Sequence, residues 1–334
     1  MLKGHGDEIY DYNREIVSNF SSNIYGKQDL SALQRHLCSR MDLIHSYPEP
    51  DAASLVRLLA DKYRISANNV CVTNGATEAI YLIAQTFQAS QTGIIIPTFS
   101  EYEDACSIHK HTLSFYKNPD EISGNEQLVW ICNPNNPDGQ VHETNYLNKI
   151  VEQNRSTIFV FDQSYGYFSK KTVWDIRQAI KSENVILLHS MTKQYAVPGL
   201  RLGYITAPVD IIKKITEKRM PWSVNGVAIE AGKYLIENET NTPDINCYLE
   251  ETGRLQKELS QISGLTVYPT DTHYFLCRLE NKKALELKNW LIDNYGILIR
   301  DASNFRGLNE HYFRIATQSP EENEQLVKAI REWI

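Results

Sequence analysis

A lysine flanked by hydroxyl side chains is the residue of this chain best suited to covalent chemistry. Residues 190–193 read Ser-Met-Thr-Lys, and Arg201 follows a few positions later. The amine of Lys193 can form a Schiff base with a carbonyl. The hydroxyls of Ser190 and Thr192 can hold a phosphate together with the Arg201 guanidinium. These residues fit a ligand that carries both an aldehyde and a phosphate, and a solvated loop lysine is the plain alternative.

A second candidate phosphate anchor lies much earlier in the chain. Residues 69–73 have the pattern of a buried strand, and Gly75, Ala76 and Thr77 follow at the start of an apolar helical pattern. A glycine lets the backbone approach a ligand closely, and the free amides of a helix start favour an anion. Taken alone, the segment also fits an ordinary strand-to-helix turn.

Aromatic and amide side chains suited to a flat ring follow two further strand patterns. Tyr102 comes after the strand pattern of residues 93–97, where its ring can lie over a heteroaromatic ligand. Asn136 lies in the run Asn-Pro-Asn-Asn-Pro-Asp-Gly at 133–139, whose prolines and glycine predict a rigid turn. We expect this turn to direct the Asn136 amide inward, as a donor to a phenolic oxygen.

A carboxylate ends the next strand pattern. Asp162 follows the apolar residues 157–161 and can pair with a protonated ring nitrogen, which would strengthen the ring as an electron sink. Tyr165 can reach the same phenolic oxygen as Asn136. A helix N-cap aspartate is the alternative interpretation of Asp162.

Each of these candidate residues comes shortly after the end of a predicted strand. Strand patterns end near residues 73, 96, 132, 161, 189 and 207, and helical patterns alternate with them from about 31 to 220. This alternation predicts an α/β fold with a mostly parallel sheet that is covered on both faces. Ligands of such folds bind beyond the carboxyl ends of the strands.

The last third of the chain has a different pattern. A charged helical region runs to about 262, and strand patterns follow near 265–268, 274–278, 297–300 and 312–316, with one helix between them and one at the end. This α+β character predicts a smaller second domain. We expect an N-terminal arm over 1–30, a large domain over 31–225 and a small domain over 226–334.

Composition argues against several classes of function. The chain has 334 residues, 42% of them hydrophobic, which is enough for about two domains. Its net charge of −7 disfavours a nucleic-acid partner. The six cysteines are widely spaced and predict neither a metal site nor a disulfide framework. Because no signal peptide is evident and no apolar run approaches the ~20 residues of a membrane span, we expect a cytoplasmic protein without a membrane partner.

Taken in order, the motifs resemble the fold-type I enzymes of pyridoxal 5′-phosphate (PLP), and among them the histidinol-phosphate aminotransferase branch. The resemblance covers nearly the whole chain and rests on residues 75–77, 102, 133–139, 162–165, 190–193 and 201–203. It implies a large PLP-binding domain and a small C-terminal domain that packs with the N-terminal arm. It also implies that PLP is the cofactor and that Lys193, Asp162 and Tyr165 take part in catalysis.

The resemblance further implies where the substrate binds. Arg314 matches the arginine that binds the substrate carboxylate in this family, and Arg300 matches the one that binds the phosphate of a phosphorylated substrate. A pair of salt bridges at a strand edge is the alternative for both. Tyr47 matches a tyrosine that reaches the PLP phosphate of the neighbouring subunit, which implies a homodimer with shared active sites.

Several segments resemble the L-threonine-O-3-phosphate decarboxylases of cobalamin synthesis in particular. They are residues 4–6, 20–24, 220–225, 297–300 and 304–308. By analogy, His5 and Gly6 help to bind the substrate phosphate, and Asn23 lies near the carboxylate. We therefore expect a decarboxylase that acts on a small phosphorylated amino acid. The alternative is an aminotransferase that transfers an amino group from histidinol phosphate to 2-oxoglutarate.

The sequence departs from the family pattern at three positions. Asp7 replaces the second glycine of the arm, Asp138 stands where threonine is usual, and Gln163 replaces a common glutamate. We expect only Asp7 to affect substrate identity, because a carboxylate beside a bound phosphate is repulsive unless it points away. A PLP-binding regulator without catalysis is a third hypothesis, which the presence of Lys193 disfavours.

Overall fold

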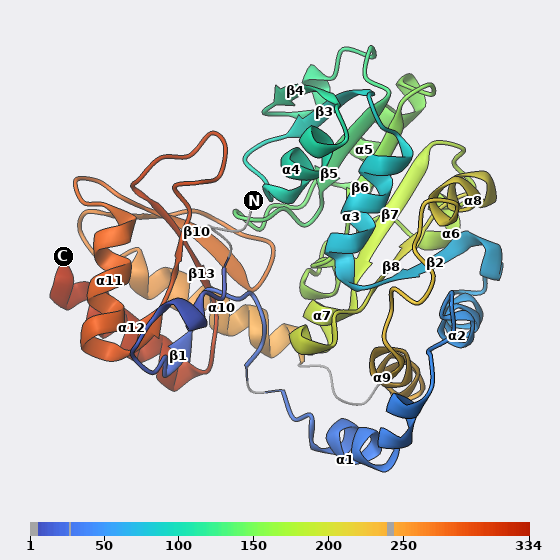
Figure 1. The fold of residues 1–334 in the computed structure, drawn as a ribbon. Coiled ribbons are helices and arrows are strands. Elements are labelled where there is room, and N and C mark those ends of the chain that lie inside the picture. Colours follow the sequence, from blue (N-terminus) through green and yellow to red (C-terminus); the bar gives the residue numbers. More distant parts are fainter. Residues whose placement is uncertain (1–5, 27, 239–243) are drawn as a thin grey trace.

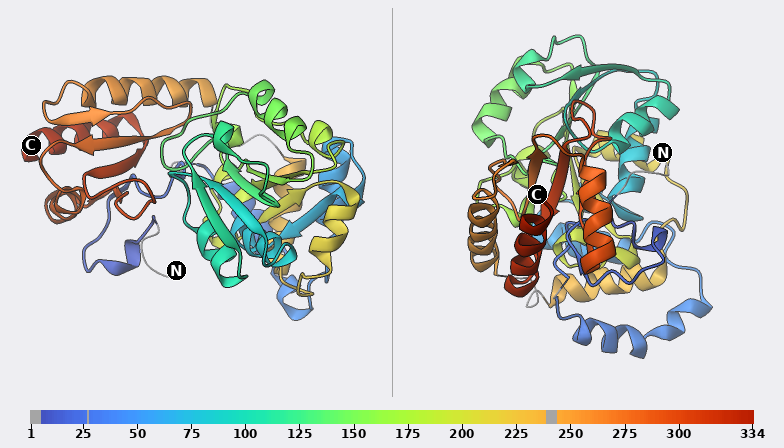
Figure 2. Two further views of the ribbon diagram at one scale, coloured as in Figure 1. Left: turned by 90° about the horizontal axis from the view of Figure 1, so that it is seen from above. Right: turned by 90° about the vertical axis from the view of Figure 1, so that its left-hand side faces the viewer.

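Two larger sheets and one short ribbon organise the chain (Figure 1). The computed structural model describes residues 6–26, 28–238 and 244–334. A seven-stranded sheet occupies one half of the molecule, and a four-stranded sheet occupies the other half (Figures 1 and 2). In Figure 1 the N-terminal arm (dark blue) lies beside α12 in the half with the four-stranded sheet and then leads to α1.

The seven-stranded sheet is mostly parallel, which confirms the predicted fold class. Its strand order is β2-β8-β7-β6-β5-β3-β4, and β8 alone runs antiparallel to its neighbours. Strand β4 has no counterpart in the sequence prediction, because this half-buried edge strand lacks a continuous apolar run. The strands are β2 (Val70–Thr73), β3 (Gln91–Ile95), β4 (Thr112–Tyr116), β5 (Leu128–Cys132), β6 (Ile158–Asp162), β7 (Val185–Ser190) and β8 (Gly203–Thr206).

Helices cover both faces of this sheet, as its buried strands require. Because successive side chains of a strand point to opposite faces of the sheet, the core has two parts. Trp130 and Val160 pack under the helices of one face, and Val129 and Phe161 pack under those of the other. The first face carries α3 (Gly75–Thr86), α4 (Glu101–Ile108) and α8 (Val209–Thr216). The second carries α5 (Thr144–Gln153) and α6 (Ile176–Ala179), with α2 (Ala53–Tyr63) and α9 (Gly226–Glu237) beside β2 and β8.

The four-stranded sheet is antiparallel, with the order β12-β13-β10-β9. Three helices cover only one of its faces, where Phe275, Phe313 and Ile315 form a second core. Because side chains alternate along a strand, Arg314 lies on the other face. The elements are β9 (Leu265–Val267), β10 (Tyr274–Leu279), β12 (Arg300–Asp301) and β13 (Tyr312–Ala316), with α10 (Ile245–Leu259), α11 (Ala284–Tyr295) and α12 (Pro320–Trp333).

The N-terminal arm joins the half that contains the four-stranded sheet. Strand β1 (Ser18–Asn19) pairs in parallel with β11 (Ile297–Leu298), and helix α1 (Ser31–Ser39) follows the arm. The strand predicted over 297–300 is therefore divided, because β11 pairs with the arm whereas β12 joins the four-stranded sheet.

The predicted domain division falls at the first residue of α9. This helix packs with α2 beside the larger sheet, through Ala228, Ala231 and Leu235. Helix α10, in contrast, contributes Leu255 and Leu259 to the core of the smaller sheet. We therefore propose that the small domain begins after α9 rather than at residue 226. Across the described ranges, no helix is both long and apolar enough to cross a membrane.

Candidate active site

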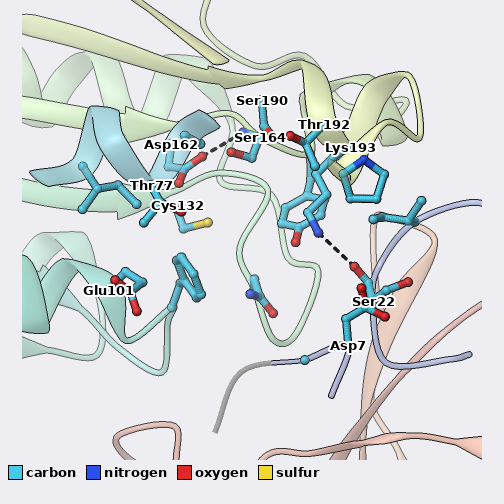
Figure 3. A pocket seen from close by; sticks show the side chains of 18 of the residues that line it. Asp7, Ser22, Thr77, Glu101, Cys132, Asp162, Ser164, Ser190, Thr192 and Lys193 are labelled. Atoms are coloured by element: carbon cyan, nitrogen blue, oxygen red, sulfur yellow. Dashed lines mark hydrogen bonds between the residues drawn. The ribbon is translucent and has the colours of Figure 1, made fainter. Parts of the chain in front are cut away.

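A cavity of about 780 Å³ lies where the strand ends of the large sheet meet the start of α3, the arm and β13 (Figure 3). Most of the residues singled out in the sequence line it, although they come from distant parts of the chain. These lining residues are Gly6, Ala76, Thr77, Tyr102, Asn136, Asp162, Tyr165, Ser190, Thr192, Lys193, Arg201 and Arg314.

Lys193 points into this cavity from the short helix α7 (Met191–Gln194), which follows β7. Its Nζ donates a hydrogen bond to the carbonyl oxygen of Ser22 at 2.9 Å (Figure 3). Burial lowers the pKa of Lys193 to about 8, and the positive charges of Arg314 and Arg201 act in the same direction. More of the amine is therefore neutral near pH 8 than in an exposed lysine, and the neutral amine is the nucleophile.

Asp162 ends strand β6 and is 4% exposed. Its carboxylate accepts hydrogen bonds from the Tyr102 hydroxyl at 2.7 Å and from the Ser164 backbone amide at 2.8 Å. Burial raises the pKa of Asp162, and these hydrogen bonds oppose the rise. Both donors are neutral, so a protonated ring nitrogen in the cavity would supply the positive charge that the buried carboxylate favours.

Tyr102 is held in place by two contacts. Its ring stacks on Trp130 with the centroids 5.0 Å apart, and its hydroxyl is bound to Asp162. The hydrogen bond to Asp162 had no sequence signal, because the two residues are 60 positions apart. That the ring of Tyr102 covers a flat ligand stays a prediction.

The candidate phosphate anchors Thr77, Ser190, Thr192 and Arg201 line the same cavity. Thr192 is buried, and no group in the described part of the chain forms a hydrogen bond with its Oγ1. Ser190 and Arg201 line the same cavity, and burial lowers the pKa of Arg201. Gly75 has a φ of +80°, and a Cβ there would come within 2.5 Å of the Arg201 guanidinium, so glycine is required. An unpaired hydroxyl and an exposed guanidinium that line one cavity fit phosphate oxygens.

Tyr165 and Asn23 form a buried pair on another side of the cavity. The Asn23 side-chain amide donates to the Tyr165 hydroxyl at 3.2 Å, while its Oδ1 has no partner within the described residues. Burial raises the pKa of Tyr165 to about 12, so the hydroxyl stays protonated and able to donate. Asn136 is also buried, and its Oδ1 accepts a hydrogen bond from Arg314.

Arg300 and Arg314 are direct cross-strand partners on β12 and β13, and each is at most 5% exposed. Arg314 donates to Asn136 and to the Ser21 carbonyl, and its Nε has no partner in the part of the chain that is described. Burial lowers the pKa of Arg314 to about 10, and the charge of Arg300 contributes to the decrease. Two buried like charges placed in this way are unfavourable unless anions bind between or beside them.

A smaller cavity of about 30 Å³ adjoins the two arginines. Its lining includes Gly6, Asn136, Arg300, Asn304 and Arg314. Arg300 donates to Asn304 Oδ1 at 2.7 Å and to the carbonyl of Asp301 at 2.5 Å. A Cβ on Gly6 would lie 2.6 Å from the Ser21 carbonyl oxygen, so a side chain there would disturb the contact between the arm and Arg314.

Gly75, Asn23 and Arg300 do not line the large cavity themselves, but each lies beside it, through Arg201, Tyr165 and the small cavity respectively.

Two further predicted site residues are not placed at either cavity. Tyr47 is 87% exposed and packs against Trp222 instead, with ring centroids 5.5 Å apart. His5 lies outside the residues that the structure describes.

The three departures from the family pattern have different surroundings. Asp7 lines the large cavity but not the small one, and its carboxylate accepts a hydrogen bond from the Asn19 side chain at 2.5 Å. It therefore acts on Lys193, whose pKa it raises, rather than on the pocket of the two arginines. Asp138 stabilises its own turn by accepting from Asn135. Gln163 donates to the Trp174 carbonyl, outside the cavity.

Sequence reasoning missed two further features of the cavity. The Ser22 carbonyl that binds Lys193 carries no side-chain signal, because any residue offers a carbonyl. Glu101 is 5% exposed and lines the cavity. Its position just after a predicted strand end could have marked it as a site residue. Within the described ranges, no group of three or more His, Cys, Asp or Glu side chains suits a metal ion.

Comparisons with known proteins agree with this geometry. The family model for aminotransferase class I and II matches residues 15–330. The threonine-phosphate decarboxylase of Salmonella typhimurium is 30% identical, over 94% of this chain and 90% of that protein. A histidinol-phosphate aminotransferase of Caldanaerobacter subterraneus is 29% identical, over 86% of this chain and 84% of that protein.

A solved structure and a longer relative extend the comparison. The L-threonine-O-3-phosphate decarboxylase of Porphyromonas gingivalis has 38% sequence identity and a TM-score of 0.93, and the match covers 95% of this chain and 99% of that one. The chain spans only 41% of the adenosylcobalamin biosynthesis bifunctional protein CobDQ of Leptospira interrogans, with 29% identity over 98% of this chain.

The residues present fit the cofactor that this family uses, PLP. The fit rests on the unpaired Thr192 hydroxyl, the Gly75–Arg201 contact and the buried Asp162, together with a lysine of lowered pKa in the same cavity. These features, the fold and the family model lead to one assignment. The chain belongs to the aminotransferase class I and II family and is a PLP-dependent enzyme.

Proposed function

We propose that this enzyme decarboxylates a small phosphorylated amino acid, and that its substrate is L-threonine O-3-phosphate. The products would be CO2 and (R)-1-amino-2-propanol phosphate. The observation that carries the proposal is the cross-strand pair Arg300 and Arg314, two buried cations beside a small cavity. A substrate with a carboxylate and a phosphate offers one anion to each arginine.

The cavity residues fall into those proposed to bind PLP and one, Lys193, proposed to transfer a proton. We infer that Thr192, Ser190 and Arg201 hold the PLP phosphate and that Asp162 stabilises the positive charge of its ring nitrogen. When bound, PLP supplies an electron-withdrawing ring that accepts the electron pair released at the substrate α-carbon. With its pKa near 8, Lys193 is suited to hold or transfer a proton near neutral pH.

Substrate orientation depends on the arginine side of the cavity. Arg314 would bind the carboxylate and Arg300 the phosphate. Asn136 and the Ser21 carbonyl hold the Arg314 guanidinium in place, which fixes the direction of the bond to the carboxylate. The relatives that are threonine-phosphate decarboxylases support this assignment by their identity and coverage.

The second candidate function is amino transfer from histidinol phosphate to 2-oxoglutarate. It is supported by the similarity to histidinol-phosphate aminotransferases. The buried pair of cations fits both reactions in part, since 2-oxoglutarate also carries two anionic groups.

One experiment separates the two reactions. PLP-loaded enzyme is incubated with L-threonine O-3-phosphate in the absence of any keto acid, and CO2 release is followed over many turnovers. Sustained release is expected. Stoichiometric amino transfer to 2-oxoglutarate from histidinol phosphate, with no CO2 from threonine phosphate, would replace the decarboxylase proposal by the aminotransferase one.

We further infer that the enzyme is a homodimer with shared active sites, and that it works in the cytoplasm. The inference of a homodimer is supported by apolar side chains that are exposed together with Tyr47, namely Ile44, Met220 and Trp222. Size-exclusion chromatography with light scattering tests the assembly. A Tyr47→Ala variant should keep the dimer but bind PLP more weakly, and a monomer in solution would contradict the inference.

A further inference from the structure

A second large cavity, of about 650 Å³, lies away from the residues assigned to catalysis. Its walls come from the end of α2, from the segment 171–177 and from the ends of β6 and β7. The volume lies within the roughly 300–1,000 Å³ that is usual for small-molecule sites. The lining residues are Lys62, Tyr63, Arg64, Gln163, Lys171, Thr172, Val173, Trp174, Asp175, Ile176, Arg177 and His189.

The rim of this cavity is positively charged, although the chain as a whole carries a net charge of −7. Its four cations are Lys62, Arg64, Lys171 and Arg177, and Asp175 is its one carboxylate. Asp175 already pairs with Arg177 at 3.3 Å, and an aspartate outside the cavity pairs with Lys171 at 2.9 Å. Arg64 is exposed and forms no ion pair with any described residue. The lining thus holds more cations than carboxylates, and Arg64 takes part in none of these ion pairs, which favours an anion.

The inner wall of the cavity is aromatic and uncharged. Trp174 is 3% exposed and stacks on Phe161, and its Nε1–H has no acceptor within the described residues. His189 stacks on Tyr204 with the centroids 4.5 Å apart, and burial lowers its pKa to about 3, so its ring is neutral. Tyr63 completes the wall, with its hydroxyl 2.8 Å from that of Tyr204. Flat side chains of this kind favour a planar or apolar ligand body.

The two cavities lie on opposite faces of the large sheet, at the ends of the same strands, β6 and β7. Side chains alternate along β6 and β7, so Asp162 and Ser190 face the active-site cavity, whereas the adjacent Gln163 and His189 line the second one. The second cavity is thus separate from the PLP site, yet only one residue away from it along each strand.

We propose that this second cavity binds a small organic phosphate with a planar body. The rim cations compensate the phosphate charge, and the planar body lies against Trp174 and Tyr63. A nucleic acid is disfavoured as the occupant, because the net negative charge of the chain repels a long polyanion.

The test measures binding of 1-naphthyl phosphate to the PLP-loaded enzyme by isothermal titration calorimetry. Inorganic phosphate and 1-naphthol serve as partial ligands, since each lacks one half of the proposed recognition. We expect 1-naphthyl phosphate to bind at least tenfold more tightly than either one. No turnover is involved, so the result does not depend on the reaction proposed above.

Charge-reversal variants locate the bound probe. Lys62→Glu combined with Arg64→Glu should weaken binding at least tenfold, because it replaces attraction at the rim by repulsion. Lys257→Glu is the matched control, an exposed lysine of α10 that lines neither cavity, and it should leave the affinity unchanged. A milder double variant with alanine at both rim positions is used if the charge reversal impairs folding, as judged by circular dichroism.

A third variant distinguishes the two cavities. Arg300→Ala should not alter probe binding if the probe occupies the second cavity. Loss of binding in Arg300→Ala with retention in the rim variants would place the probe in the active site and overturn the proposal. Absence of saturable binding up to several millimolar would overturn it as well, as would equal affinities for 1-naphthyl phosphate and inorganic phosphate.

Discussion

Replacement of Arg300 by alanine gives the sharpest test of how the substrate is recognised. Arg300 is 5% exposed and directly opposite Arg314, so its charge acts in a site that largely excludes water. We expect the variant to lose affinity for phosphorylated substrates far more than for their unphosphorylated analogues. The fold should tolerate the change, because it also removes the repulsion between two buried cations.

The magnitude follows from the contacts that would be lost. A hydrogen bond to a charged group contributes about 1.5–3 kcal/mol, and Arg300 lines the small cavity. This corresponds to a decrease in kcat/KM for L-threonine O-3-phosphate of about 10- to 150-fold. The affinity for L-threonine, which lacks the phosphate, should change less than about threefold.

The assay compares kcat/KM for the phosphorylated substrate with the inhibition constant of L-threonine. Arg306→Ala is the matched control, since Arg306 lies on the same segment but is exposed and paired with Glu103 at 2.6 Å. Arg300→Lys should recover part of the loss, because it keeps the charge but not the planar fork. An equal loss for both ligands in Arg300→Ala would show that Arg300 does not contact the phosphate.

Four further predictions concern the cofactor side of the cavity. Lys193→Ala should abolish turnover yet retain PLP noncovalently, which equilibrium dialysis and mass spectrometry of borohydride-treated protein can measure. The rate of covalent PLP attachment should rise with pH through about 8, the pKa of Lys193, because the neutral amine reacts. Asp7→Asn should move that profile to lower pH, since Asp7 raises this pKa, and an unshifted profile in stopped-flow absorbance would contradict the assignment. Thr192→Val should weaken PLP binding by about fivefold without lowering the apoprotein melting temperature, because its hydroxyl has no partner among the described residues; a clear fall in that temperature would show a structural role.

The sequence predicted the large sheet and most of the cavity because their signals are local. Apolar strands, each followed by a polar residue, mark the carboxyl edge of a parallel sheet, so Asp162 and Lys193 had to lie near each other. The two arginines fall within the last two strand patterns of the chain, and the structure pairs Arg300 with Arg314 directly. Their roles, in contrast, rested on family resemblance and remain to be measured.

The remaining features depend on contacts between distant segments. Nothing in residues 297–300 indicates that β11 pairs with an arm strand at Ser18–Asn19, because strands of two residues, one of them polar throughout, carry no register information. The packing of α9 against α2 likewise depends on the match between the apolar faces of the two helices, and neither helix alone indicates its partner. The contact between Lys193 and the Ser22 carbonyl spans 171 positions and uses a backbone atom that every residue has.

The hydrogen bonds of Arg314 determine the order in which the parts of the site can form during translation. Its guanidinium joins the Ser21 carbonyl, 293 positions earlier, to Asn136 in the middle of the chain. Residues 75–201, which supply the proposed phosphate anchors, Asp162 and Lys193, leave the ribosome well before Arg314 does. Because domains tend to fold as they emerge, the cofactor cleft can form on the nascent chain while the arm is still unattached. The substrate carboxylate contact proposed for Arg314 is then the last part of the site that the growing chain acquires.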